Sequence, residues 1–160
     1  MSAPSVSSNS LVRSLFLGKT PAASFLPFPV PDAETRETTE EIVAMVSSWA
    51  ADAIDTAAID TNKTIPKEVI DGLSELGLLG LIVPEEHGGI GMGQYTYSRV
   101  MEVVANRCAS TVTVIGGHMG LCMKPVLLFG TDEQKARWLP TFANGETIGS
   151  FALTEAGAGS

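Results

Sequence analysis

The last ten residues of the chain, Phe151-Ala152-Leu153-Thr154-Glu155-Ala156-Gly157-Ala158-Gly159-Ser160, decide how the rest of the sequence is interpreted. The apolar run from Phe151 to Thr154 ends in a β-branched residue and predicts a short strand. The glycines that follow allow the backbone to approach a ligand closely, with amides free to face an anion. The hydroxyl groups of Thr154 and Ser160 add hydrogen-bond donors. Such a loop suits a phosphate or the edge of a flavin ring, although small-residue loops are more often simple turns.

The segments before these ten residues favour the ligand-binding interpretation. They are residues 130–135 (GTDEQK), 138–140 (WLP) and 144–147 (NGET). Together with the final ten residues they closely resemble the acyl-CoA dehydrogenase family. In that family an equivalent helix is followed by a strand-and-loop motif, aromatic-x-Leu-Thr-Glu-Pro-x-x-Gly-Ser, which packs on FAD. The resemblance covers residues 36–160, and more loosely residues 11–34, whose Phe-Pro-x-Pro segment is similar to the very-long-chain branch.

The resemblance implies an all-α fold, namely the N-terminal helical domain of the acyl-CoA dehydrogenase fold. It divides the chain into an extended, partly disordered leader at residues 1–35, a helical domain at residues 36–146, and residues 147–160. This last part corresponds to the first strand of a β-barrel domain. Since the chain stops inside the motif, we expect it to be the front part of a longer enzyme.

Hydrophobic periodicity predicts the same helices independently. The capping box at residues 38–41 (TTEE) predicts a helix start, because a hydroxyl and a glutamate there satisfy early backbone amides. The predicted buried face of this helix comprises Ile42, Met45, Val46, Trp49, Ala53 and Ala57. Pro66 predicts a second start and Gly77 its end. Its predicted buried face comprises Val69, Ile70, Leu73 and Leu76.

The second half of the helical part follows the same logic. Residues 88–93 (GGIGMG) lack the glycine pattern of a dinucleotide fingerprint and predict a turn-rich loop. Residues 95–106 predict a third helix. Residues 111–129 are apolar without alternation, which favours a helix buried on all sides. Thr131 and Gln134 form a second capping box, for a helix expected to close at Pro140.

Composition excludes several classes of function. The formal net charge of −8 argues against nucleic-acid binding. Cys108 and Cys122 fit neither a metal motif nor a disulfide framework, and are expected to be buried thiols in a reducing compartment. Prolines, charges and glycines interrupt every apolar run, so we expect no membrane-spanning helix and no stable membrane insertion. The resemblance implies a cytoplasmic protein, or a mitochondrial matrix protein if the source is eukaryotic.

The resemblance also implies the reaction and the cofactor site. The family oxidises a fatty acyl-CoA to the trans-2-enoyl-CoA, with FAD as the cofactor and an electron-transfer flavoprotein as the electron acceptor. It assigns cofactor binding to Phe151, Leu153, Thr154, Gly159 and Ser160, with Ser160 also meeting the substrate. Phe151 often appears as tyrosine in the family and Ala156 replaces a usual proline, so this loop is expected to be less rigid.

No catalytic residue and no metal site are predicted within the chain. The catalytic glutamate of the family lies in a C-terminal helical domain, beyond residue 160. Asp52, Asp55 and Asp60 are expected to form a solvated helix face. The lone His118 is expected to be a hydrogen-bonded core histidine, because the sequence places no carboxylate or cysteine partner beside it.

Gly116, Gly117 and Gly120 form a further candidate site. Glycine inside a helix costs about 1 kcal/mol relative to alanine, so their accumulation suggests a constraint. In the family this helix lines the acyl-chain cavity, which makes Gly116 and Gly117 candidate substrate-binding residues. Close packing between helices is the alternative explanation.

Other functions remain open at this point. A flavin-dependent monooxygenase of the same fold would share the helical domain. The chain could also be a non-catalytic helical interaction module, or a binder of lipid or acyl carrier. A complete dehydrogenase is expected to be a homo-oligomer.

Overall fold

The computed structural model describes residues 11–19 and 30–159. The chain divides into two units, residues 1–32 and residues 33–160. In the first unit, helix α1 (Leu11–Phe16) ends in a turn where the amide of Lys19 donates to the carbonyl of Ser14 at 2.8 Å. Most of the predicted extended leader, including the start of its Phe-Pro-x-Pro segment, lies outside the described residues.

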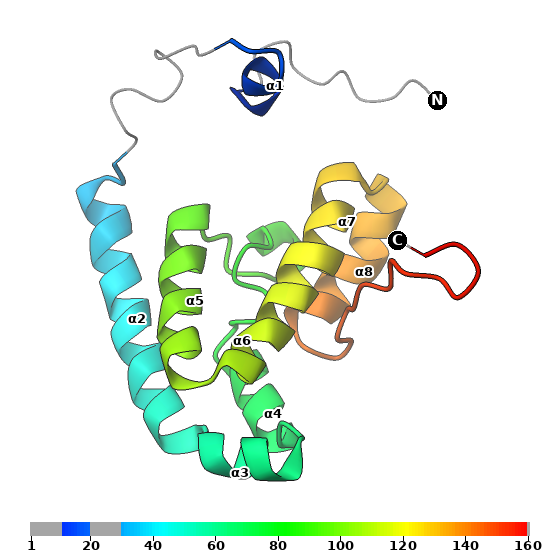
Figure 1. Cartoon of the computed structure of the whole chain (residues 1–160). Coiled ribbons are helices and arrows are strands. Elements are labelled where there is room, and N and C mark those ends of the chain that lie inside the picture. The colour runs from blue at the N-terminus through cyan, green and yellow to red at the C-terminus, as the bar shows by residue number, and fades with distance from the viewer. Residues whose placement is uncertain (1–10, 20–29, 160) are drawn as a thin grey trace. The chain divides into compact units, whose positions relative to one another are not determined.

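The second unit is helical, which confirms the all-α prediction (Figure 1). Within residues 30–159 no strand is present, and the only β-type pairing is an isolated bridge between Glu155 and Gly159. The elements are α2 (Ala33–Ala53), α3 (Thr56–Asn62), α4 (Lys67–Glu75), the short 3-10 helix η2 (Glu85–His87), α5 (Gln94–Arg107), α6 (Ala109–Ile115), η3 (Gly116–Met123), α7 (Lys124–Phe129) and α8 (Asp132–Ala143).

The core of this unit lies between helices that are distant in sequence. Helices α2 and α5 run side by side, α5 contacts α6, and α7 contacts α8 (Figure 1). Their inward side chains are completely buried and apolar, which is the main source of stability in such a unit. Those with no exposed surface include Val46, Leu73, Leu81, Val100, Val104, Ile115, Met119, Met123 and Leu139.

Helix α2 begins earlier than its capping motif predicts. The helix starts at Ala33, so residues 38–41 lie inside it and the predicted start is wrong. The hydroxyl of Thr39 donates to the carbonyl of Thr35 at 2.6 Å and bonds to the hydroxyl of Thr96 on α5 at 2.8 Å. Thr39 therefore serves as a buried polar contact between two helices, a role that depends on tertiary packing rather than on local sequence.

A break separates α2 from α3, which the sequence analysis did not predict. Asp55 caps α3 by accepting a hydrogen bond from the amide of Ala58 at 3.0 Å. Arg107, at the end of α5, donates to the carbonyls of Ile54 at 3.0 Å and Ala51 at 3.2 Å. A cation at a helix C-terminus satisfies unpaired carbonyls and offsets the helix dipole, so Arg107 ties the end of α2 to α5.

The predicted long helix at residues 111–129 is present, but it is not buried on all sides. Elements α6, η3 and α7 form one continuous helix, Ala109–Phe129, whose middle segment has π-helical hydrogen bonding. One side carries the buried Ile115, Met119 and Met123, whereas Leu121 is 53% and Phe129 74% exposed. One side of the helix is therefore buried and the other exposed, although apolar residues occur on both.

This continuous helix also corrects the prediction about membrane spans. By length and composition, Ala109–Phe129 is apolar enough to cross a membrane. Core helices of soluble proteins meet the same criterion, and this one contacts both α5 and α8 within the unit. Such core helices are mostly buried, however, whereas only 22% of the most apolar window of this helix is buried.

The capping box of α8 is confirmed. The amide of Gln134 donates to the hydroxyl of Thr131 at 3.2 Å, and the Gln134 side chain accepts from the Thr131 amide at 2.9 Å. The predicted end at Pro140 is wrong, because α8 continues through Pro140 to Ala143. The two residues that follow the proline, Thr141 and Phe142, anchor the helix end, Phe142 through its buried ring.

The glycine-rich loop is confirmed as a turn-rich segment, and it packs tightly on the preceding chain. The amides of Ile90, Gly91 and Met92 donate to carbonyls of residues 80, 83 and 81 at 2.7–3.2 Å. A Cβ atom on Gly89 would overlap the carbonyl oxygen of Val83 and lie 2.6 Å from that of Gly80. Only glycine allows these two backbone segments to approach so closely.

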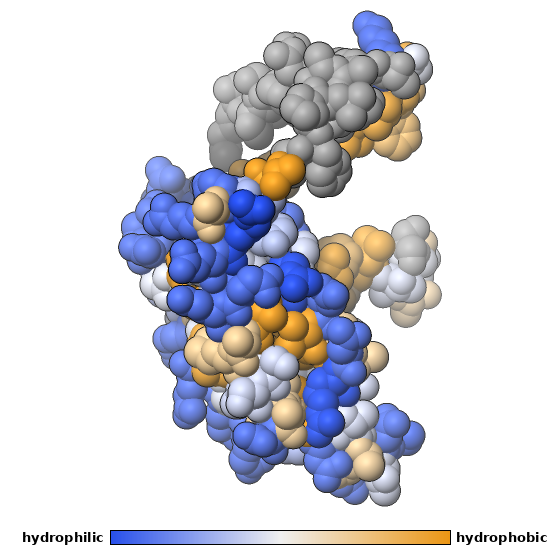
Figure 2. All heavy atoms as spheres, turned by 90° about the vertical axis from the view of Figure 1, so that its left-hand side faces the viewer, coloured by the Kyte–Doolittle hydropathy of each residue, from blue (hydrophilic) through white to orange (hydrophobic). Residues whose placement is uncertain are grey.

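The surface formed by α2 and its neighbours is mainly hydrophilic. Figure 2 shows this side covered largely by hydrophilic residues, with hydrophobic ones confined between them. Arg99 of α5 pairs with Glu40 at 3.3 Å and with Glu102 at 2.5 Å. Exposed ion pairs of this kind contribute little to stability, so α2 is held by its buried face.

We predict that Gly89→Ala destabilises this unit by about 3 kcal/mol, because the new methyl group meets backbone atoms that cannot move aside. The matched control is Gly93→Ala, whose Cβ would have no neighbour within 4 Å. Because Gly93 is the N-cap of α5, where alanine is less favourable than glycine, the control is expected to cost no more than about 1 kcal/mol. Urea unfolding followed by far-UV circular dichroism measures both variants. Equal stability of the two would contradict the steric argument.

Candidate functional site

The segment predicted to bind a cofactor is exposed. The side chains of Phe151 and Leu153 are 57% and 59% exposed, and Thr154 is exposed beside them. The predicted strand at residues 151–154 is absent from the described structure. A strand pairs its backbone groups with a second strand, and residues 30–159 contain no strand with which this segment could pair. Ser160 lies outside the described residues.

The loop after Thr154 closes on itself. The amide of Glu155 donates to the carbonyl of Gly159 at 3.1 Å, and the amides of Ala158 and Gly159 donate to the carbonyl of Glu155 at 3.3 and 2.9 Å. Gly159 has a φ of +70°, which glycine adopts without strain. These three amides are therefore used within the loop, contrary to the expectation that the loop amides are free to face an anion.

The helix glycines differ in what surrounds them. A Cβ on Gly116 would lie 3.3 Å from the terminal methyl of Met101 on α5, which is a packing contact. A Cβ on Gly117 would meet nothing within 4 Å, and one on Gly120 would lie 3.9 Å from the hydroxyl of Tyr97. Gly117 shares its helix face with the exposed Thr113 and Leu121. Gly116 thus favours the packing explanation, whereas Gly117 lines open space.

His118 is the hydrogen-bonded core histidine that the sequence predicts. Its side chain has no exposed surface, and its Nδ1 accepts a hydrogen bond from the amide of Gly149 at 2.9 Å. Its Nε2 lies 3.1 Å from the carbonyl oxygen of Phe142, whose ring also packs edge-on against the imidazole at 5.6 Å between centroids. Burial lowers the pKa of His118 and outweighs the opposing effect of the carbonyls of Phe142 and Leu79.

This histidine connects the two predicted groups of site residues. It follows Gly116 and Gly117 directly in the helix, and its partner Gly149 precedes Phe151 by two residues. A Cβ on Gly149 would overlap the sulfur of Cys122 and lie 2.7 Å from its Cβ. Burial raises the pKa of the Cys122 thiol, which is therefore a packing group here. Sequence reasoning missed Gly149 and its contact with Cys122, because nothing local pairs residues so far apart in the chain.

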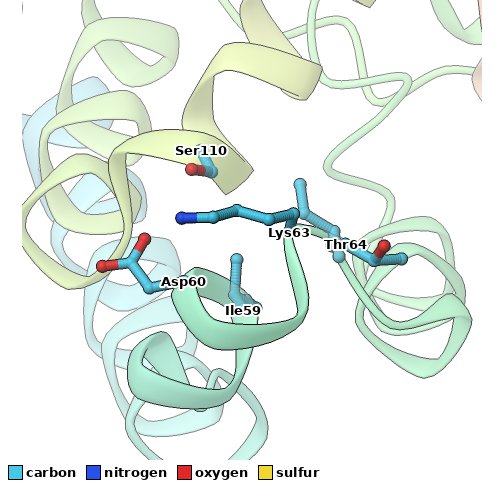
Figure 3. A pocket seen from close by; sticks show the side chains of 6 residues that line it. Ile59, Asp60, Lys63, Thr64 and Ser110 are labelled. Carbon is cyan, nitrogen blue, oxygen red and sulfur yellow. The ribbon is translucent and has the colours of Figure 1, made fainter.

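A polar pocket near α3 contains none of the predicted site residues. It is lined by Ile59, Asp60, Lys63, Thr64, Ile65 and Ser110, with a volume of about 400 Å³. Figure 3 shows the Lys63 side chain extending between Asp60 and Ser110. A carboxylate and an ammonium group on the same wall favour neither a phosphate nor an acyl chain.

No group of three or more potential metal ligands occurs in the part of the chain that the structure describes. Asp52 and Asp60 are exposed there, and Asp55 acts as the cap of α3. The acids around the α2–α3 break therefore have structural and solvent-facing roles.

The chain is similar to curated proteins of one kind. It is 36% identical over 154 residues to the mitochondrial very long-chain specific acyl-CoA dehydrogenase of Macaca fascicularis, covering 96% of this chain and 24% of that protein. It is 37% identical over 152 residues to the probable acyl-CoA dehydrogenase FadE10 of Mycobacterium bovis, covering 94% and 23%. The chain thus spans about a quarter of the length of these relatives.

Solved structures share the fold. An acyl-CoA dehydrogenase complexed with FAD from Bacillus anthracis matches with a TM-score of 0.69 and 29% identity, over 77% of this chain and 21% of that one. A chain described as an electron transferring flavoprotein of Acidaminococcus fermentans matches with a TM-score of 0.71 and 27% identity, over 82% and 34%. The family model of the acyl-CoA dehydrogenase N-terminal domain matches residues 36–146 of this chain. With most of its helical unit inside that match, the chain belongs to the acyl-CoA dehydrogenase family.

Proposed function

We propose that this chain forms the N-terminal helical part of an FAD-dependent dehydrogenase that oxidises fatty acyl-CoA to trans-2-enoyl-CoA. The observation that carries the proposal is the family match over residues 36–146, followed directly by the exposed segment Phe151–Thr154. The relatives are about four times longer than this chain, since it covers 24% of the first of them. In this proposal the catalytic base, a glutamate, is supplied from outside residues 1–160.

The exposed segment fits one side of a flavin. A flavin ring has apolar faces and a polar edge, and in this segment two exposed apolar residues, Phe151 and Leu153, precede the hydroxyl-bearing Thr154. These residues would pack beside the ring and donate to its edge, with Gly159 and Ser160 completing the loop. Bound FAD supplies the acceptor for the hydride that leaves the β-carbon of the substrate. The chain's own task is to bind the ring, orient it and help to exclude water.

The substrate is assigned to the open face of the helix Ala109–Phe129. Gly117 places no side chain on that face, and Gly116 precedes it. Leu121 extends the same face with an exposed apolar side chain. An acyl chain laid along such a surface gains about 0.8 kcal/mol for each methylene removed from water, so small side chains there favour long substrates. Ser160 would contact both the cofactor and the CoA arm.

The remaining partners follow from the same reaction. Reduced flavin must be reoxidised, and we propose an electron-transfer flavoprotein as the electron acceptor. The complete protein is proposed to act as a homo-oligomer, in the mitochondrial matrix of a eukaryote or in the cytoplasm of a bacterium. The match to relatives named mitochondrial supports the first location for a eukaryotic source.

The first test uses the complete protein that contains this chain. It is expected to purify with FAD and to reduce an electron-accepting dye with palmitoyl-CoA. Free palmitate is the control, and should give no reaction because only the thioester acidifies the α-proton. The 160-residue chain alone is expected to be inactive, since it lacks the base. A flavin-free complete protein, or turnover by the chain alone, would contradict the proposal.

The second test concerns Thr154. In the complete protein, Thr154→Val removes the hydroxyl and should weaken FAD binding by about tenfold, because a donor to the flavin edge is lost. Thr154→Ser retains the hydroxyl and is the matched control. Fluorescence titration of the apoprotein with FAD measures both affinities. Equal affinities for the valine and serine variants would show that the hydroxyl is not used.

The third test concerns Gly117. Gly117→Phe should fill open space on the substrate face, so kcat/KM should fall for long acyl chains and remain unchanged for short ones. Gly116→Ala is the packing control, because its Cβ meets Met101. The rate constant is measured against acyl chain length alongside a thermal melt. A lower melting temperature with an unchanged chain-length profile would identify Gly117 as a packing residue only.

A further inference from the structure

The protonation of His118 can be read from its two hydrogen bonds. A backbone amide can only donate, so the 2.9 Å contact from Gly149 places a lone pair on Nδ1. The proton of the neutral ring is therefore on Nε2, which donates to the carbonyl of Phe142 at 3.1 Å. Complete burial and a lowered pKa agree with a neutral imidazole. Both ring nitrogens are thus used, each in a fixed role.

The two partners of His118 lie on either side of the turn that leaves α8. Phe142 belongs to the last turn of α8, and Gly149 lies beyond the connecting residues 144–148. The turn has its own bonds: the Glu146 amide donates to the Asn144 side chain at 2.9 Å, and the Thr147 amide to the Thr141 carbonyl at 3.0 Å. The imidazole of His118, which lies on η3, therefore bonds to the chain both before and after the connecting residues 144–148.

The packing at Gly149 leaves no room for a different path. Cys122 is four residues after His118 in the same helix, and its side chain occupies the space that a Cβ on Gly149 would need. Gly149 therefore packs against the side chain of Cys122 and donates to His118, and both of these residues belong to η3. After this point, Phe151 and Leu153 are exposed. The hydrogen bond from Gly149 to His118 thus ties the chain to the helical core just before the exposed segment begins at Phe151.

We propose that His118 is a positioning residue, whose neutral imidazole holds Gly149 and thereby sets where the flavin-binding segment Phe151–Thr154 lies relative to the helical unit. This inference rests on the proposed function for the identity of the ligand. The hydrogen bond itself, and its effect on the segment, belong to the chain alone.

Two substitutions separate the two ring nitrogens. In His118→Asn the amide oxygen takes the place of Nδ1 and can accept from Gly149, while the contact to Phe142 is lost. In His118→Gln the longer side chain places an N–H group near Nε2 and can donate to Phe142, while the acceptor for Gly149 is lost. Both variants put a polar amide into the same buried site, so each serves as the control for the other.

The first measurement uses NMR on the 160-residue chain without flavin. The amide of Gly149 should exchange with solvent about tenfold faster in His118→Gln than in His118→Asn, because one hydrogen bond is lost. The amide shifts of residues 151–154 should move in the glutamine variant and stay near their original values in the asparagine variant. Equal exchange rates and equal shifts in the two variants would overturn the proposal.

The second measurement is FAD affinity in the complete protein. The dissociation constant should rise about tenfold in His118→Gln and remain within about twofold in His118→Asn. An equal loss in both variants would show that His118 supports folding only, and would overturn the positioning role. If the wild-type protein binds no FAD, the proposed function fails, and the NMR comparison still decides whether His118 positions the segment.

Discussion

Burial of one side of the helix Ala109–Phe129 is the interaction on which the rest of the helical unit depends. Ile115, Met119 and Met123 have no exposed surface, and each fully buried apolar side chain contributes about 1.5–3 kcal/mol. The helix contacts α5 near its start and α8 near its end. Through α5 it also fixes α2, which is packed along α5.

The sequence predicts those features of the fold whose cause is local. The capping box at Thr131 and Gln134 is present because both partners lie within one helical turn. A similar pattern at residues 38–41 does not begin a helix, because α2 already starts at Ala33, and Thr39 inside it bonds to Thr96, which lies 57 positions away in the sequence. The apolar run at residues 111–129 gives a helix, but which side stays exposed depends on where α5 and α8 pack. Local chemistry therefore predicts the elements better than their burial.

The candidate site divides in the same way. A resemblance over contiguous residues points to the segment from Phe151 to Gly159, and the structure describes this segment as exposed. Its link to the helical unit could not be predicted, because the bond between His118 and Gly149 joins residues 31 positions apart. The glycine at position 149 carries no sequence signal of its own. Only the overlap that its Cβ would make with Cys122 shows why glycine stands there.

The π-helical segment Gly116–Met123 determines how the two ends of its helix are oriented about their common axis. Each residue of an α-helix turns the chain by about 100°, whereas hydrogen bonds to the fifth residue back accommodate more residues per turn. Deleting one residue here would let the segment return to α-helical hydrogen bonding, and would therefore rotate Leu128 and Phe129 by less than the roughly 100° expected from a deletion in an α-helix. The π-helical segment is therefore the part of this helix where the loss of one residue would least change the side that α7 presents.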